Sequence, residues 1–177
     1  DRDAGSLQAE ATDVGRSPRG YQQEIPLHDG PAPVAGDIEP NAAGPSFGLL
    51  WESPALDGAI YAEPLFVGDQ VFVATDGDTV YALDATTGQV QWHTNLGQPV
   101  PRAELPCGNI DPTGITSTPV VDSTRGLVYV VPFLMPAHHE LVALDLATGA
   151  ERFRRPIDPT GRDPMVEQQR SALTLVG

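Results

Sequence analysis

Residues 80–92 read Val-Tyr-Ala-Leu-Asp-Ala-Thr-Thr-Gly-Gln-Val-Gln-Trp. Two short runs with alternating apolar side chains flank a turn at 84–88 that ends in Gly88, and this pattern is typical of two antiparallel strands joined by a tight connection. The pattern returns at 141–153 as Leu-Val-Ala-Leu-Asp-Leu-Ala-Thr-Gly-Ala-Glu-Arg-Phe, where Gly149 lies 61 positions after Gly88 (149 − 88 = 61). A hairpin that recurs with the same turn chemistry predicts a repeated structural unit.

Further short alternating runs precede each copy of this hairpin, so each copy predicts an antiparallel meander of four strands. The strands are expected at 60–67, 70–75, 79–84 and 89–94, and again at 115–121, 127–131, 141–145 and 150–154. A third copy begins at 170–177, where Leu-Val-Gly at 175–177 corresponds to Phe-Val-Gly at 66–68. Four-stranded meanders that recur at roughly 40–60 residues predict a β-propeller.

Composition agrees with an all-β fold. The chain of 177 residues contains 18 Gly and 18 Pro, which indicates many turns, and no stretch has the 3.6-residue periodicity of an amphipathic helix. The formal net charge of −14 argues against nucleic-acid binding, because an acidic surface repels phosphates. No apolar run approaches the roughly 20 residues of a membrane span.

The pattern divides the chain into two parts. Residues 1–46 lack strand signals and are expected to form an extended, Pro- and Gly-rich arm. Residues 47–177 are expected to form a partial propeller, with blade one at about 47–97, blade two at about 115–156 and the first strand of a third blade at 170–177. Since a closed ring needs roughly four to eight blades, we expect a fragment of a longer protein, or a ring that other chains complete.

The turn motif also carries a family resemblance. Residues 82–92 match Ala-x-Asp-x-x-Thr-Gly-x-x-x-Trp at every fixed position, and 143–153 match with Phe in place of Trp. This motif resembles the tryptophan-docking repeat of quinoprotein-like propellers, which are named after pyrroloquinoline quinone (PQQ). The resemblance implies a structural role in blade docking for Asp84, Thr87, Gly88, Trp92, Asp145, Thr148, Gly149 and Phe153.

The resemblance implies two functions. The first is an extracytoplasmic propeller (periplasmic, secreted or at the cell surface) that acts as a binding or assembly scaffold for a protein partner. The alternative is a PQQ-dependent dehydrogenase that oxidises alcohols or sugars with PQQ and calcium, whose cofactor ligands would lie largely outside this chain. The quinone dehydrogenases often carry a pair of adjacent cysteines over the cofactor, whereas this chain has a single cysteine. We therefore favour the scaffold and expect no catalytic residue in the chain.

Few other residues suggest chemistry. Cys107 lies in a Pro-rich loop, where we expect a disulfide to a cysteine outside the chain; a free thiol is the alternative. Asn109 and Asp111 in the same loop offer oxygen ligands and form the best candidate for a metal site. The adjacent His138 and His139 are expected in a solvated loop.

Overall fold

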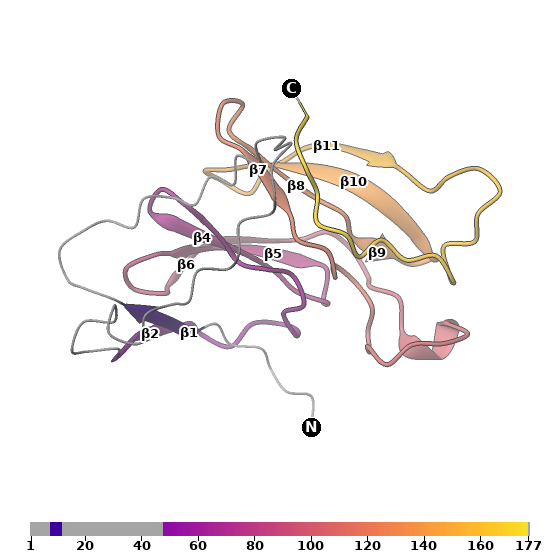
Figure 1. Ribbon diagram of the computed structural model, residues 1–177, viewed down its shortest axis with the longest axis horizontal. Coiled ribbons are helices and arrows are strands. Elements are labelled where there is room, and N and C mark those ends of the chain that lie inside the picture. Colours follow the sequence, from indigo (N-terminus) through magenta and orange to yellow (C-terminus); the bar gives the residue numbers. More distant parts are fainter. Residues whose placement is uncertain (1–7, 12–47, 177) are drawn as a thin grey trace, which may run out of the picture.

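Three antiparallel sheets follow one another along the chain in the computed structural model, which describes residues 8–11 and 48–176 (Figure 1). The first sheet has two strands, β1 (Gln8–Ala11) and β2 (Gly48–Glu52). The second is a meander of β3 (Leu65–Val67), β4 (Gln70–Ala74), β5 (Thr79–Asp84) and β6 (Val90–Asn95).

The third sheet has the order β11-β10-β8-β7, with a short β9 on β10. Its strands are β7 (Val120–Asp122), β8 (Leu127–Val130), β9 (Phe133–Leu134), β10 (His138–Asp145) and β11 (Glu151–Pro156). The described residues contain no α-helix, only the 3-10 turn η1 (Arg102–Glu104), and none of their helical segments is long and apolar enough to cross a membrane. The predicted all-β class and four-stranded antiparallel units are confirmed.

Burial explains why the strands are so apolar. All but the last residue of β5 is buried, because the second sheet packs on both faces, and a strand that is covered twice reads as a continuous apolar run rather than an alternating one. One core cluster (Val71, Val73, Tyr81 and Leu83) lies toward Trp51 of the first sheet. The other joins Ala74 and Val80 of the second sheet to Val128, Val130, Val142 and Leu144 of the third.

The repeat extends to the details of pairing. In the second sheet Trp92 lies opposite Ala82, and a β-bulge follows between Ala82 and Leu83. In the third sheet Phe153 lies opposite Ala143, and the bulge again follows Ala143. The two hairpins therefore present their last aromatic residue in the same register.

The structure differs from the sequence-based expectations at both ends. Strand β1 lies within 1–46, where no strand was expected; the rest of that arm lies outside the described residues. Strand β2 pairs with β1 rather than with the four-stranded sheet that follows it. At the other end, the strand expected at 170–177 is wrong for the described residues 170–176, which form no strand. This segment makes one backbone hydrogen bond to another described part of the chain, from Leu173 N–H to Thr118 O at 3.0 Å.

Candidate functional site

The first contact between sheets joins β2 to the turn between β5 and β6. The indole N–H of Trp51 donates a hydrogen bond of 2.9 Å to the carbonyl of Ala85. The ring lies against Gly88, where a Cβ atom would come within 2.4 Å of Trp51 Cε3. Gly88 has φ of +71°, a conformation that glycine adopts without strain. Both the backbone and the nearby indole therefore require a glycine. We call this arrangement the Trp–Gly contact.

The second Trp–Gly contact joins β6 to the turn between β10 and β11. The indole N–H of Trp92 donates to the carbonyl of Leu146 at 3.2 Å, and a Cβ atom on Gly149 would lie 2.4 Å from Trp92 Cε3. Thr94 adds a hydrogen bond of 2.7 Å from its hydroxyl to the Gly149 carbonyl. The Phe72 ring packs against the indole of Trp92, with ring centroids 5.8 Å apart. The structure thus brings together Trp92 and Gly149, two of the residues that the motif singled out.

The Asp and Thr residues of the motif build the two turns. The Asp84 carboxylate accepts hydrogen bonds from the backbone N–H of Thr87 at 2.8 Å and from its hydroxyl at 3.0 Å. Asp145 and Thr148 repeat this pattern at 2.9 and 2.8 Å. The hydrogen bonds to Asp84, of which that from the Thr87 N–H has the largest effect, lower its pKa. The pKa of Asp145 falls to about 2, chiefly because the Arg152 side chain donates a hydrogen bond to its carboxylate. Both turns are held closed by an ionised aspartate.

Phe153 occupies the third aromatic position. It packs on Tyr129 with ring centroids 6.1 Å apart, just as Trp92 packs on Phe72. No glycine of the described residues lies against its ring. Phe153 therefore packs on an aromatic ring of its own sheet, as Trp92 does, but it contacts no turn glycine of the described residues.

The connection between β6 and β7 forms one rim of the molecule. The Arg102 guanidinium donates to the carbonyls of Gly108 at 2.6 Å and Leu105 at 2.9 Å, while its backbone N–H donates to Asp111 Oδ1 at 3.0 Å. Val100 and Thr113 pair across the base of the loop. The loop is therefore closed by its own hydrogen bonds.

The exposed side chains of this loop include the three that the sequence singled out, Cys107, Asn109 and Asp111. Cys107 has no disulfide within the described residues, and its pairing with a cysteine outside the chain stays a prediction. The metal site at Asn109 and Asp111 also stays a prediction; the Asp111 carboxylate already accepts from Arg102. Among the described residues, no group of three or more His, Cys, Asp or Glu side chains is arranged to hold a metal ion.

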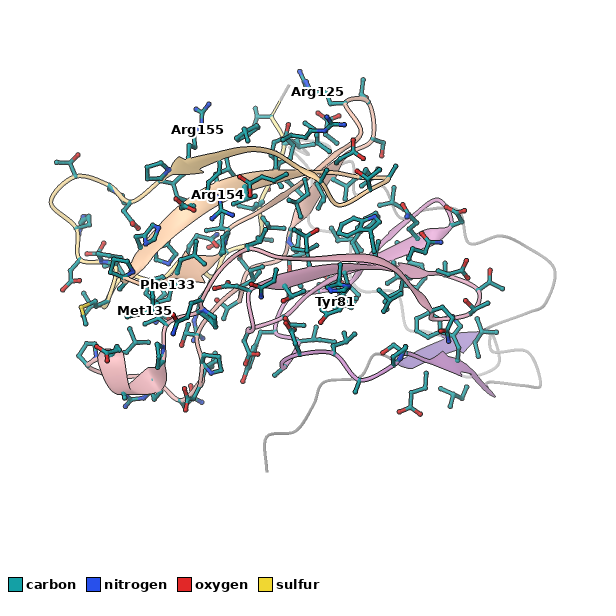
Figure 2. All side chains as sticks on the ribbon, turned by 180° about the vertical axis from the view of Figure 1, so that it is seen from behind. Tyr81, Arg125, Phe133, Met135, Arg154 and Arg155 are labelled. Atoms are coloured by element: carbon teal, nitrogen blue, oxygen red, sulfur yellow. The ribbon has the colours of Figure 1, made fainter. Side chains whose placement is uncertain are left out.

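The connection after β11 meets the same rim. Met165 packs against the cluster of Val100, Leu105 and Phe133, so the two connections lie together although they are far apart in sequence. In Figure 2, Phe133 and Met135 lie beside the ribbon turn of η1. We define the rim as residues 97–114 and 157–169.

A cavity of about 310 Å³ opens on the rim between His139 and the segments 157–159 and 167–169. His139 is only 4% exposed and stacks on Phe133 with ring centroids 4.4 Å apart. Its Nδ1 lies 2.8 Å from Asp158 Oδ1, and its Nε2 accepts the Gln169 N–H at 3.4 Å. The imidazole thus donates to Asp158 through Nδ1. The expectation of a solvated loop was wrong for both histidines, because β10 begins at His138. His138 is half-buried, and the side chain of His139 turns inward.

Asp78 is buried where the second sheet meets the loop before β7. Its side chain is 0% exposed, and neither carboxylate oxygen has a hydrogen-bond partner among the described residues. Gly114 lies so close that a Cβ atom there would come within 2.7 Å of Asp78 Oδ1. Burial raises the pKa of Asp78 to about 8. The nearby backbone N–H groups of Phe133 and Ile115 oppose this rise although they lie outside hydrogen-bond geometry, and the charges of Asp76 and Asp57 add to it. Asp78 therefore holds a proton at neutral pH.

Several of these residues were not recognised from the sequence. Trp51 lies near the end of an apolar run, as Trp92 does. This similarity could have predicted that Trp51 packs on the turn of the next hairpin, at 84–88. Arg102, His139 and Asp158 had no such signal, since their partners come from loops whose path a strand pattern does not give. Asp78 lies between the strands predicted at 70–75 and 79–84, where no sequence pattern signals burial, although the structure buries its side chain against Gly114.

Comparison with known proteins supports the repeat. The family model described as outer membrane protein assembly factor BamB matches residues 46–176. No curated protein sequence matches the chain significantly.

Among solved structures, the chain is similar to BamB from Moraxella catarrhalis, with 25% identity over 61% of this chain and 28% of that chain and a TM-score of 0.45. It is similar to quinohemoprotein alcohol dehydrogenase from Comamonas testosteroni, with 21% identity over 62% of this chain and 16% of that chain and a TM-score of 0.44. It is also similar to a europium-containing methanol dehydrogenase, with 18% identity over 62% of this chain and 19% of that chain and a TM-score of 0.46. The chain spans less than a third of the length of each of these structures.

The family match covers most of the chain, and it includes both turns that carry the Trp–Gly contacts. The chain belongs to the PQQ-like repeat β-propeller family that is described as outer membrane protein assembly factor BamB.

Proposed function

We propose that this chain is part of an extracytoplasmic propeller that acts as a binding or assembly scaffold for a protein partner. The family description, which names an assembly factor, supports this role. The observation that carries the proposal is the rim loop closed by Arg102. A loop that is ordered before binding loses little conformational entropy when a partner docks, so its exposed side chains are suited to recognition.

Cross-linking at the rim tests this role. A photoreactive amino acid at exposed Asn109 should give one discrete adduct in the envelope of the native cell, with a partner identified by mass spectrometry. The matched control is exposed Thr86, in a turn outside the rim, which should not give that adduct. The same adducts from both positions, or none from Asn109, would contradict the scaffold.

A cofactor test separates the scaffold from the quinone-dependent dehydrogenase. We expect the purified full-length protein to show no quinone absorbance after incubation with PQQ and calcium and dialysis, and no dye-linked oxidation of alcohols or sugars. A dehydrogenase of established activity, loaded in the same way, serves as the positive control. Retained absorbance together with turnover would favour the dehydrogenase and overturn the scaffold as the main function.

A further inference from the structure

The cavity on the rim lies where the connection after β11 returns to the start of β10 (Figure 1). Its volume of about 310 Å³ is at the lower end of the range of pockets that hold small ligands. His139, residues 157–159 and residues 167–169 form its wall. The loop that Arg102 closes contributes no residue to this wall, so the cavity is separate from the surface of that loop.

Asp158 holds the wall of the cavity in place through His139. Asp158 Oδ1 accepts a hydrogen bond from His139 Nδ1 at 2.8 Å, and Oδ2 accepts one from the His139 backbone N–H at 2.9 Å. The Ile157 N–H donates to the His139 carbonyl at 3.1 Å, and the imidazole stacks on Phe133. Because these contacts join the two segments, the cavity is formed before a ligand enters, which lowers the entropic cost of binding.

The polar groups of the cavity are mainly acceptors. Asp158 and Glu167 contribute two carboxylates, and no arginine or lysine lies among the described residues of the wall. The side-chain oxygen of Gln169 is buried and has no hydrogen-bond partner among the described residues. Such a wall suits a ligand that carries positive charge and several N–H donors.

The rest of the wall favours an organic cation over a metal ion. Ile157 and Pro159, both exposed, flank Asp158, and the aliphatic stem of a long basic side chain can pack on such residues while its charged head reaches a carboxylate. A metal ion fits less well, because both oxygens of Asp158 already accept from His139. No group of three or more described His, Cys, Asp or Glu side chains is arranged to hold one.

Glu167 is engaged by a contact that a ligand can replace. Arg162 donates to Glu167 Oε1 at 2.9 Å, and the two side chains are 62% and 46% exposed. An ion pair with this exposure contributes little to stability. A guanidinium from another protein can therefore take the place of Arg162 at little cost, and it can donate two parallel hydrogen bonds to the carboxylate.

We propose that this cavity binds an arginine side chain of the protein partner, with the guanidinium on Glu167 and the aliphatic stem against Ile157 and Pro159. The formal net charge of −14 favours the approach of a basic surface. Arginine fits better than lysine, because its planar group can donate to the Glu167 carboxylate and to a neighbouring amide oxygen at once. This inference rests on the proposed scaffold function, since it names the chemistry by which the partner is recognised.

Titration of the purified full-length protein with acetyl-arginine methylamide, followed by NMR, tests the cavity. We expect saturable binding that E167Q weakens at least about fivefold, because a charged hydrogen bond is lost. R162Q should strengthen binding about twofold, because it removes the competing guanidinium. The matched control D69N, in an exposed turn outside the rim, should leave binding unchanged.

The uncharged probe acetyl-citrulline methylamide, which has nearly the same shape, should not bind. Equal binding of the two probes would overturn the proposal, because recognition would then not depend on charge. A lack of saturable binding of the arginine probe, or binding that E167Q leaves unchanged, would also overturn it. Since the Glu167 side chain is 46% exposed, E167Q is expected to fold as the native protein does, which a urea unfolding curve checks.

Cross-linking in the cell separates the cavity from the scaffold function. The adduct from the photoreactive amino acid at Asn109 should fall at least about fivefold in the E167Q background and should not change in the D69N background. An undiminished adduct in E167Q would overturn the proposal, because the partner would then dock without the cavity. The absence of any adduct in the parent protein would contradict the scaffold, whereas an intact adduct without binding of the arginine probe would contradict the cavity alone.

Discussion

Replacing Trp92 by alanine is expected to lower the free energy of unfolding by about 3–5 kcal/mol, the range for truncating a buried aromatic side chain. The indole fills the space between Phe72 and Gly149, so its removal leaves a cavity between the second and third sheets. The change also removes the hydrogen bond to Leu146 O. Both losses fall on the same junction, and we infer that this junction holds the two sheets together.

Urea unfolding followed by circular dichroism measures the effect. Trp92→Phe keeps a ring over Gly149 but loses the N–H donor, so it should cost about 1 kcal/mol. Tyr61→Ala, at a residue that is 50% exposed, serves as a control for removing an aromatic side chain and should cost less than about 1 kcal/mol. A loss below about 1 kcal/mol for Trp92→Ala would show that the indole does not hold the sheets together.

The second large effect concerns Asp78 and pH. The folded protein keeps the Asp78 proton up to a pKa of about 8, whereas the ordinary pKa is 3.8. The contribution of Asp78 is therefore most favourable below pH 3.8 and declines as the pH rises to about 8. Since one pKa unit corresponds to about 1.4 kcal/mol, the decline is on the order of 6 kcal/mol. Asp78→Asn removes the titrating group, so the stability of the variant relative to the native protein should rise across this range.

Unfolding curves at pH 4, 6, 8 and 9 measure this difference. Asparagine tolerates the φ of +57° at position 78, so the backbone should not be strained by the change. Asp69→Asn, at an exposed position, is the control for loss of one negative charge and should follow the native protein at every pH. If the Asp78→Asn curve ran parallel to the native one from pH 4 to pH 8, Asp78 would be ionised in the folded state.

The sequence predicted the repeating architecture because that information is local. Each signal involves residues that lie within a few positions of one another in the sequence. The signals are the alternation of apolar residues along a strand, the aspartate that hydrogen-bonds to its own turn, and the glycine with positive φ. The register of Trp92 opposite Ala82, and of Phe153 opposite Ala143, follows from such local rules. The same rules name Gly88 and Gly149, although only the structure shows which tryptophan each glycine contacts.

The rest depends on contacts between distant segments. His139 and Asp158 meet across 19 positions, and Asp78 is enclosed by Gly114 of the following loop; neither pair lies in a periodic pattern. Strand β1 could not be foreseen because its four residues pair with β2, some 40 positions later. Periodicity reports which face of a strand is buried, and loops that cross between units carry no such signal.

The central claim is that consecutive units are joined by an aromatic ring packed on a turn glycine, and Gly149→Ala compared with Gly126→Ala tests it most directly. Both glycines have positive φ, +71° and +66°, so the backbone cost of alanine, about 1 kcal/mol, is shared. A Cβ atom on Gly126 would meet no described atom within 4 Å, whereas one on Gly149 would lie 2.4 Å from Trp92 Cε3. We predict that Gly149→Ala lowers the free energy of unfolding by about 1–3 kcal/mol more than Gly126→Ala. Equal losses for the two variants would contradict the account.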